Sequence, residues 1–397
     1  MQPPILIDPS PAYGAGADAG RTPTPLRTAV RDGRRLILDL APEEFRREIG
    51  ALLEKLGERP YRAGQLREWV YVRRAGSFEE MSNLPISLRG ALAERYVLSS
   101  LSLEERAASV DGTEKFLWRL ADGREVESVS IPGSRKLTYC ISSQVGCPLA
   151  CSFCATGKLG YTRQLTAGEI VDQVRSLLRL TRGALGETAG REPNLVFMGM
   201  GEPLLNLRNV LPALAWLTAD EFLNLGARRI TVSTAGVAPR IADLSAFNPQ
   251  IKLAVSLHAP EDELRDDLVP LNRRHPLTEL MAACRAFARA TGKRITFEYI
   301  HLPGVNDRPG HPAALRDLLE GIPAKINLIP YNPVPGLPHR APTERESEAF
   351  LQRLQGTLRC SVTLRRPRGR DIGGACGQLE LERHPERLVE PLHAVGG

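Results

Sequence analysis

The chain has 397 residues, of which 42% are hydrophobic and 25% charged, so it is long enough for one large domain and a smaller one. No apolar run reaches the roughly 18 residues of a membrane span, and no apolar signal-peptide core opens the sequence, so we expect a cytoplasmic protein without membrane contact. Seven cysteines suit a reducing compartment better than a disulfide scaffold, and the net charge of +6 is compatible with a polyanionic partner such as RNA.

The first third of the chain divides into three parts. Residues 1–40 are rich in Pro, Gly, Ala and Arg and predict a disordered extension. Residues 41–105 predict a small helical accessory domain, because apolar residues recur at helical spacing after Pro42. Its arginines form either an RNA-binding face or a solvated basic face, since composition alone fits both. Residues 106–135 alternate at the period of a strand around Ala121-Asp-Gly123 and predict a β-hairpin linker.

The rest of the chain alternates strands and helices. Residues 136–382 therefore predict an α/β catalytic domain with a parallel sheet of βα units, and residues 383–397 a C-terminal tail. Thr166 and Glu169 have the spacing of a capping box, which starts a helix. The strand candidates are residues 137–142, 195–198, 229–233, 251–256, 295–300, 326–329 and 361–365.

Three cysteines follow the first of these strands. Cys147, Cys151 and Cys154 have the spacing C-x3-C-x2-C. Three thiolates suit a [4Fe–4S] cluster that keeps one iron open, whereas structural zinc requires four ligands. A zinc site completed by His258 or Cys140 is one alternative, and a chance grouping of cysteines in a loop is another. An Fe–S electron carrier fits less well, because it would need a fourth cysteine ligand.

Small and polar residues follow four later strands. Gly201 and Glu202 lie in Met198-Gly-Met-Gly-Glu-Pro-Leu204, where glycine allows close approach of a ligand and the carboxylate can accept from an ammonium group. A plain Gly/Pro turn is the alternative. Turn or helix-cap roles are the alternatives for the remaining residues. Those residues are Ser233, Ser256, Leu257, His258 and Asn332.

Two further cysteines have contexts that favour reactivity. Cys376 lies between Ala375 and Gly377 in a glycine-rich segment, away from any apolar periodic face, which favours an accessible thiol over a packed one. Cys140 lies seven residues before the triplet, within the first predicted parallel strand. Because the strand ends converge on one barrel mouth, we expect these two thiols to meet there.

These motifs resemble those of the radical SAM (S-adenosylmethionine) enzymes, which implies a partial TIM-type (βα)6 barrel with a small N-terminal helical domain. The match narrows to the RlmN/Cfr-type rRNA adenine methyltransferases over about residues 41–380. It is carried by Ala-Cys376-Gly-Gln-Leu, Cys140 before the triplet, Met-Gly-Met-Gly-Glu-Pro, Ser-Leu-His and Asn-Leu-Ile-Pro-Tyr-Asn-Pro.

The resemblance implies methylation of C2 of an adenosine in 23S rRNA, and in tRNA as well. Two SAM molecules are used per turnover: one methylates Cys376, and the other, bound at the [4Fe–4S] cluster, yields a 5′-deoxyadenosyl radical. Glu127 matches the base that removes the ring proton, although a hairpin carboxylate is often only solvated. Cys140 then forms a disulfide with Cys376 and releases the RNA.

The resemblance further implies a monomer that is reduced by a donor such as flavodoxin or ferredoxin. A C8-methylating relative of the Cfr type shares every cysteine named above and is the nearest alternative. The second alternative is a radical SAM enzyme with a different activity, although such an enzyme would have no need of Cys140 and Cys376.

Overall fold

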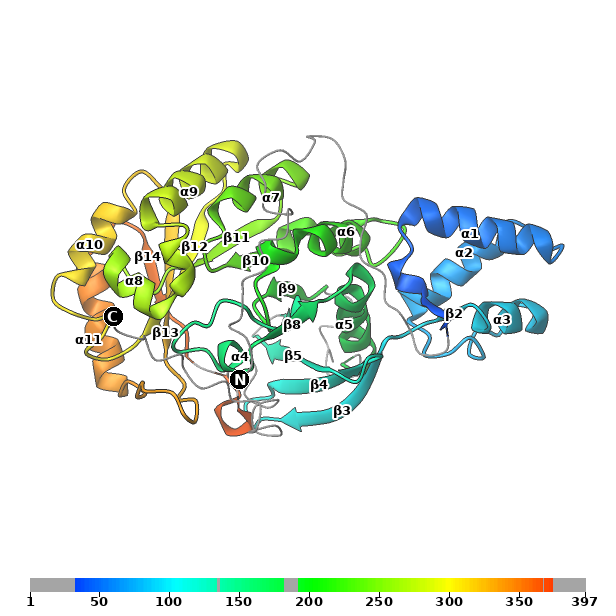
Figure 1. The fold of residues 1–397 in the computed structure, drawn as a ribbon, viewed down its shortest axis with the longest axis horizontal. Coiled ribbons are helices and arrows are strands. Elements are labelled where there is room, and N and C mark those ends of the chain that lie inside the picture. The colour runs from blue at the N-terminus through cyan, green and yellow to red at the C-terminus, as the bar shows by residue number, and fades with distance from the viewer. Residues whose placement is uncertain (1–32, 134–135, 182–191, 367, 374–397) are drawn as a thin grey trace, which may run out of the picture.

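The computed structural model describes residues 33–133, 136–181, 192–366 and 368–373. No helix in those ranges is long and apolar enough to cross a membrane. At one end of the molecule lies the N-terminal module, residues 35–97 (Figure 1). Its elements are β1 (Arg35–Leu36), α1 (Pro42–Lys55), α2 (Arg62–Arg67), a π-helical turn (Glu68–Arg73), α3 (Ile86–Ala93) and β2 (Tyr96–Val97). Helix α1 starts at Pro42, which suits a first helical turn, and buries the apolar stripe that the sequence predicted.

Ten strands of the described chain form one open sheet, in the order β14-β13-β12-β11-β10-β9-β6-β5-β4-β3. From β6 to β14 the pairings are parallel, and from β3 to β6 they are antiparallel. The parallel strands are β6 (Leu137–Cys140), β9 (Asn194–Phe197), β10 (Ile230–Thr234), β11 (Lys252–Ser256), β12 (Ile295–His301), β13 (Ala324–Pro330) and β14 (Ser361–Leu364). The antiparallel ones are β3 (Leu101–Ala108), β4 (Glu114–Leu120) and β5 (Glu125–Pro132).

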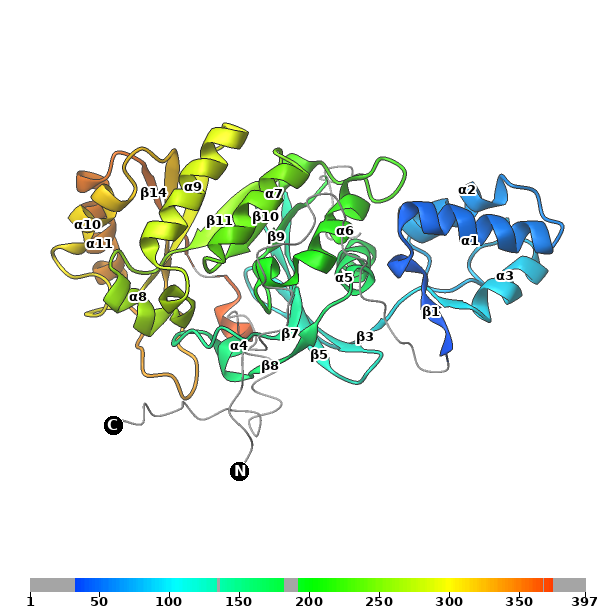
Figure 2. The same ribbon diagram turned by 45° about the horizontal axis from the view of Figure 1, so that its top comes forward.

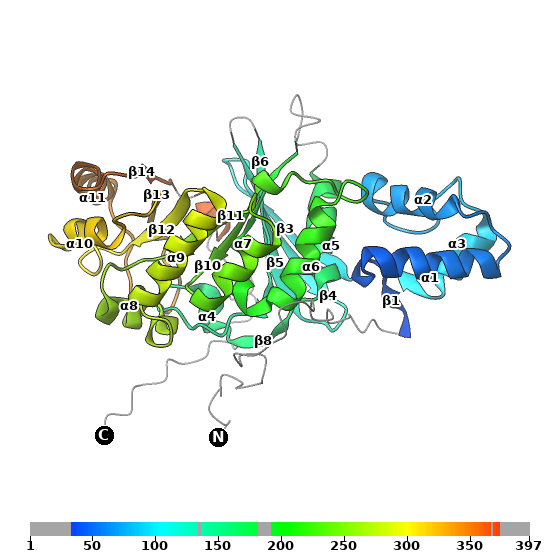
Figure 3. The same cartoon turned by 90° about the horizontal axis from the view of Figure 1, so that it is seen from above.

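Helices connect successive parallel strands and cover the outer side of the sheet, as Figures 2 and 3 show for α5, α6, α7 and α9. The six crossovers between β6 and β14 are the partial (βα)6 barrel that we expected. They contain α5 (Ala167–Leu180), α6 (Leu207–Thr218), α7 (Ile241–Phe247), α8 (Asp262–Leu268), α9 (Leu277–Thr291), α10 (His311–Leu318) and α11 (Glu344–Thr357). The capping box at the start of α5 is formed by Thr166 and Glu169.

The hairpin over residues 106–135 is present as β4 and β5, but it does not stand alone. Strand β3 pairs with β4 and begins at Leu101, inside the range that we predicted to be helical. Strand β5 pairs with β6. The three antiparallel strands therefore extend the barrel sheet, and this edge carries Glu127 into the barrel domain.

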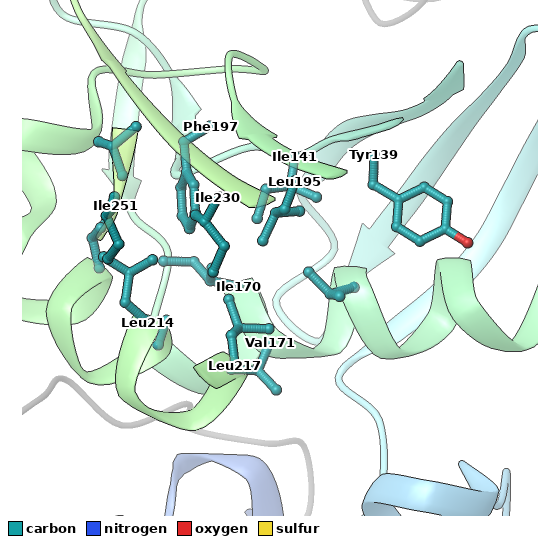
Figure 4. Close-up of a cluster of buried hydrophobic side chains, with 14 of the residues drawn as sticks. Tyr139, Ile141, Ile170, Val171, Leu195, Phe197, Leu214, Leu217, Ile230 and Ile251 are labelled. Atoms are coloured by element: carbon teal, nitrogen blue, oxygen red, sulfur yellow. The ribbon is translucent and has the colours of Figure 1, made fainter. Parts of the chain in front are cut away.

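The main core lies between the sheet and its helices. Ile141, directly after β6, Leu195 of β9 and Ile230 of β10 pack in one cluster with Ile170 of α5 and Leu214 of α6 (Figure 4). All five are 0–1% exposed. Since each such side chain contributes about 1.5–3 kcal/mol when fully buried, this layer holds the parallel strands in place.

The N-terminal module is packed onto the barrel. Tyr71 stacks on Trp216 of α6 with ring centroids 5.2 Å apart. Arg175 of α5 donates to the carbonyl oxygens of Ala75 and Leu98 at 3.0 and 2.8 Å. These contacts hold the module beside α5 and α6.

Candidate active site

A cavity of about 390 Å³ opens at the carboxyl ends of the parallel strands. Most of the site residues suggested by the sequence line it. Leu257 is an exception, since it is fully buried and does not line the cavity. Cys376 lies outside the described residues. The predicted residues that line the cavity are Glu127, Cys140, Cys147, Cys151, Cys154, Gly201, Glu202, Ser233, Ser256, His258 and Asn332.

The three-cysteine loop is closed by a pair of glycines. Gly146 ends the short strand β7 (Gln144–Gly146), which pairs with β8 (Tyr161–Gln164) beyond the loop. Its φ is +74°, and a Cβ at this position would lie 1.9 Å from the carbonyl oxygen of Gly160. That same oxygen accepts the N–H of Cys147 at 2.8 Å. Glycine at 146 therefore allows the two ends of the loop to meet.

The thiolate forms of the three cysteines would be stabilised by a cationic group bound beside them. Burial raises the pKa of all three cysteines, and the neighbouring thiols raise that of Cys147 further. Cys154 precedes α4 (Ala155–Lys158), and backbone N–H groups of Gly157 and Thr156 donate to its sulfur. Such N–H donors are typical partners of cluster sulfur ligands.

The number and kind of donors bear on which metal they suit. Three soft thiolates that line one cavity leave one iron of a four-iron cluster open for a ligand, whereas structural zinc requires four protein ligands. The donor set and its N–H groups fit a [4Fe–4S] cluster.

Glu202 is a buried carboxylate held by backbone donors. It is 3% exposed, and it accepts the N–H groups of Leu204 at 3.0 Å and Ala235 at 2.7 Å. Burial raises the pKa of Glu202 to about 7, against the lowering effect of these donors. A carboxylate so placed at the cavity wall fits the ammonium group of a ligand such as SAM.

His258 faces the cavity as a neutral ring. Its φ is +61°, and this conformation is held by Asn306, whose Nδ2 donates to the His258 carbonyl at 2.8 Å. The N–H of Ile300 donates to Nδ1 at 3.1 Å, so the neutral imidazole carries its proton on Nε2. Burial lowers the pKa of His258 to about 3. Phe153 meets this ring edge-on at 4.7 Å between centroids.

Cys140 and Glu127 also line the cavity. Burial raises the pKa of Cys140 to about 11, and Arg365 acts against this rise. Glu127 is 1% exposed and pairs with Lys115 at 2.8 Å, so the hairpin carboxylate is buried, not solvated. Lys115 also donates to the carbonyl oxygen of Gly373 at 2.7 Å. Because Cys376 follows Gly373 by three positions, this hydrogen bond anchors the chain just before that cysteine.

Sequence reasoning missed several cavity residues, of which Glu298 on β12 is the most informative. Its Oε1 accepts from Asn327 at 2.9 Å, while Oε2 has no hydrogen-bond partner in the described structure. Burial raises its pKa, and Arg365 opposes this. A single carboxylate in a strand whose other side chains are apolar or neutral polar was the available signal. Arg365, Arg368 and Tyr331 also line the cavity.

Comparison with known proteins agrees with this site. A family model described as the radical SAM superfamily matches residues 141–311, and one described as the ribosomal RNA large subunit methyltransferase N-terminal domain matches residues 38–98. The fold is thus that of a radical SAM enzyme.

Comparison with individual relatives identifies the family within the radical SAM superfamily. The chain is 48% identical over 337 residues to the dual-specificity RNA methyltransferase RlmN of Anaeromyxobacter sp. (strain Fw109-5), covering 84% of this chain and 88% of that protein. It is 46% identical to the probable dual-specificity RNA methyltransferase RlmN of Thermosynechococcus vestitus, over 84% of this chain and 95% of that protein. The crystal structure of a radical SAM methyltransferase from Sphaerobacter thermophilus superposes with a TM-score of 0.81 at 44% identity, covering 86% of this chain and 98% of that one. The chain belongs to the RlmN family of radical SAM RNA methyltransferases.

Proposed function

We propose that the protein methylates carbon 2 of an adenosine in 23S rRNA and in tRNA. The relatives above are named dual-specificity RNA methyltransferases, which supports RNA as the substrate. The observation that carries the proposal is that Cys140 lines the same cavity as the three-cysteine loop and Glu202. A radical SAM enzyme that modifies its substrate without a protein thiol would have no use for Cys140 there.

The cavity residues divide into two groups. Cys147, Cys151 and Cys154 hold the cluster, and Gly201 and Glu202 receive the amino group of SAM. When bound, the cluster and SAM supply the methyl group and the 5′-deoxyadenosyl radical that carbon methylation requires. Contacts to the rest of SAM come from Ser233, Ser256, His258 and Asn332, while Leu257 orients its two neighbours from the core.

The protein thiols carry and release the RNA. Cys376 holds the methyl group as a thioether. That methyl group would give one hydrogen atom to the 5′-deoxyadenosyl radical, which bound SAM would supply, and its carbon would then add to the adenine carbon as a methylene bridge. Glu127 takes the proton from that ring carbon, and the bound cluster would take up the electron released with it. The Cys140 thiolate then attacks the sulfur of Cys376, so that a disulfide forms, the sulfur–carbon bond breaks, and its electron pair leaves with the product, where a proton from solvent completes the methyl group. Arg365 favours the thiolate that this attack needs, since it acts against the raised pKa of Cys140.

Carbon 2 is preferred to carbon 8 as the target. The proteins that this chain resembles at 46–48% identity are RlmN proteins, so the Cfr-type alternative is not favoured.

The remaining features of the reaction follow the family. Two SAM molecules are consumed per turnover, and a low-potential donor such as flavodoxin or ferredoxin supplies the electron. The enzyme acts as a monomer in the cytoplasm, where its RNA substrates are made. The N-terminal module, with its arginines, binds RNA.

The test is trapping of the RNA on the protein. A Cys140→Ala protein expressed in cells should purify with covalently attached RNA, because a thioether has no easy leaving path until a second thiolate attacks it. The Cys140→Ala/Cys376→Ala protein should carry none. Cys284→Ala is the matched control, since Cys284 is fully buried on α9 and its removal should trap nothing. If Cys140→Ala also purifies free of RNA, the thiol pair is not catalytic. Mass spectrometry of RNA treated with the parent enzyme should find 2-methyladenosine, and 8-methyladenosine would overturn the assignment of carbon 2.

A further inference from the structure

Arg265 of α8 is a buried cation whose partners are mostly backbone oxygens. The side chain is 0% exposed. Its Nε donates to the carbonyl of Leu257 at 3.0 Å, and its Nη2 donates to those of Ser256 and Ala235. Its Nη1 donates to Oδ1 of Asn272 at 2.8 Å. Within the described structure, none of its hydrogen-bond acceptors is a carboxylate.

These hydrogen bonds join the carboxyl ends of two neighbouring strands. Ala235 follows β10, and Ser256 ends β11, so the guanidinium group spans the strand ends that present Ser233 and Ser256. Gly236 leaves room for it, since a Cβ there would lie 3.2 Å from Nη2 of Arg265. The local structure is thus built around this arginine.

Helix α8 also packs on the three-cysteine loop. The carbonyl of Leu268 accepts the N–H of Ser152 at 3.1 Å. Leu268 and Val269 share one apolar cluster with Cys151 and Phe153. Burial lowers the pKa of Arg265 to about 10, and Cys151, Asp262 and Asp266 act against this fall. The buried positive charge therefore lies behind the cysteine loop and acts on it through a dry, apolar layer.

Asp262 and Asp266, which accept from Asn272, offset part of the cost of burying this guanidinium group, and a further negative charge nearby would offset more. A cluster held by three thiolates carries net negative charge, and that charge grows by one when the cluster takes up an electron. In a medium of low dielectric constant, a fixed cation stabilises the more negative state.

We propose that Arg265 is a positioning residue that acts as the buried counter-charge of the cluster and raises its reduction potential, while its fork fixes the ends of β10 and β11. The inference rests on the proposed cluster and not on the identity of the RNA. The redox step is the uptake of one electron from a low-potential reductant, dithionite in the assay below.

The experiment compares reduction potentials of reconstituted variants by anaerobic titration, with the electron paramagnetic resonance signal of the reduced cluster as the readout. Arg265→Met removes the charge and should therefore lower the reduction potential of the cluster by about 59 mV. At the midpoint potential of the parent, the reduced form of the cluster in this variant should then be about tenfold less abundant than the oxidised form. Arg265→Lys keeps the charge and loses the fork, so its potential should stay within a twofold ratio of the parent while its melting temperature falls.

Arg175→Met is the matched control, because Arg175 is also buried and also donates to two backbone carbonyls, but on α5 against the N-terminal module. Arg175→Met should lower the melting temperature and leave the reduction potential of the cluster unchanged.

Arg265→Gln, which is neutral but can still donate to a carbonyl, provides the same charge change if Arg265→Met does not fold. The inference would be overturned if a neutral variant with full iron content had the same reduction potential as the parent. It would also be overturned if the reduction potential of Arg265→Lys were as low as that of Arg265→Met. Failure of the parent itself to assemble a cluster would refute the proposed function instead.

Discussion

The raised pKa of Glu202 makes a quantitative prediction about SAM binding. The carboxyl group is 3% exposed, and its pKa is about 7 because burial outweighs two backbone N–H donors. An ammonium group binds the anion and not the neutral acid. Protonation of free protein therefore multiplies the apparent Kd for SAM by 1 + 10^(7 − pH), which is about 11 at pH 6, about 2 at pH 7 and about 1.1 at pH 8.

Isothermal titration calorimetry of anaerobic, cluster-loaded protein measures this directly. The Kd for SAM should fall about fivefold from pH 6 to 7 and less than about twofold from pH 7 to 8. The same linkage sets the sign for stability. A carboxyl pKa above its ordinary value of 4.5 means that the SAM-free protein loses stability as the pH rises from 4.5 towards 7, by about 3 kcal/mol.

Glu202→Gln tests the assignment of the titrating group. Its Kd should be independent of pH, and at pH 8 it should be weaker than that of the parent by about 2 kcal/mol, roughly thirtyfold, because a charge-assisted hydrogen bond is lost. Glu221→Gln, at an exposed surface ion pair, is the control and should follow the parent profile. A parent Kd that does not change between pH 6 and 8 would refute the reasoning.

Three further predictions concern the loop, its glycine and the N-terminal module. Replacing any one of Cys147, Cys151 or Cys154 by alanine should abolish production of 5′-deoxyadenosine, and a variant that cleaves SAM at the parent rate would contradict the cluster assignment. Gly146→Ala should cost at least about 2 kcal/mol in chemical denaturation and lower the iron content, because a positive φ and a carbonyl 1.9 Å away both oppose the methyl group. Gly123→Ala, with φ +81° but nothing within 4 Å, should cost clearly less. Arg59→Glu/Arg73→Glu, at exposed positions of the N-terminal module, should weaken RNA binding and reduce the slope of its logarithmic salt dependence by about 2, while SAM cleavage without RNA stays at the parent rate.

The sequence alone was enough for features that depend on neighbours along the chain. The alternation of apolar strands with amphipathic helices predicted all seven parallel strands to within a few residues, because βα units are local in sequence. Thr166 and Glu169 predicted their helix start, since a capping box involves only four consecutive residues. The cysteine triplet likewise indicated its chemistry through spacing alone.

What the tertiary structure decided depends on pairing and burial between distant segments. No local pattern says that β5 pairs with β6, so only the fold shows that the hairpin extends the barrel sheet and buries Glu127 against Lys115. Arg265 looks like an ordinary surface charge in the sequence, and the single carboxylate of the β12 segment, Glu298, does not by itself reveal that it faces a cavity. Their buried positions arise because the barrel encloses one and α8 packs the other behind the cysteine loop, and burial in a low-dielectric interior is what gives a charge its effect on a site.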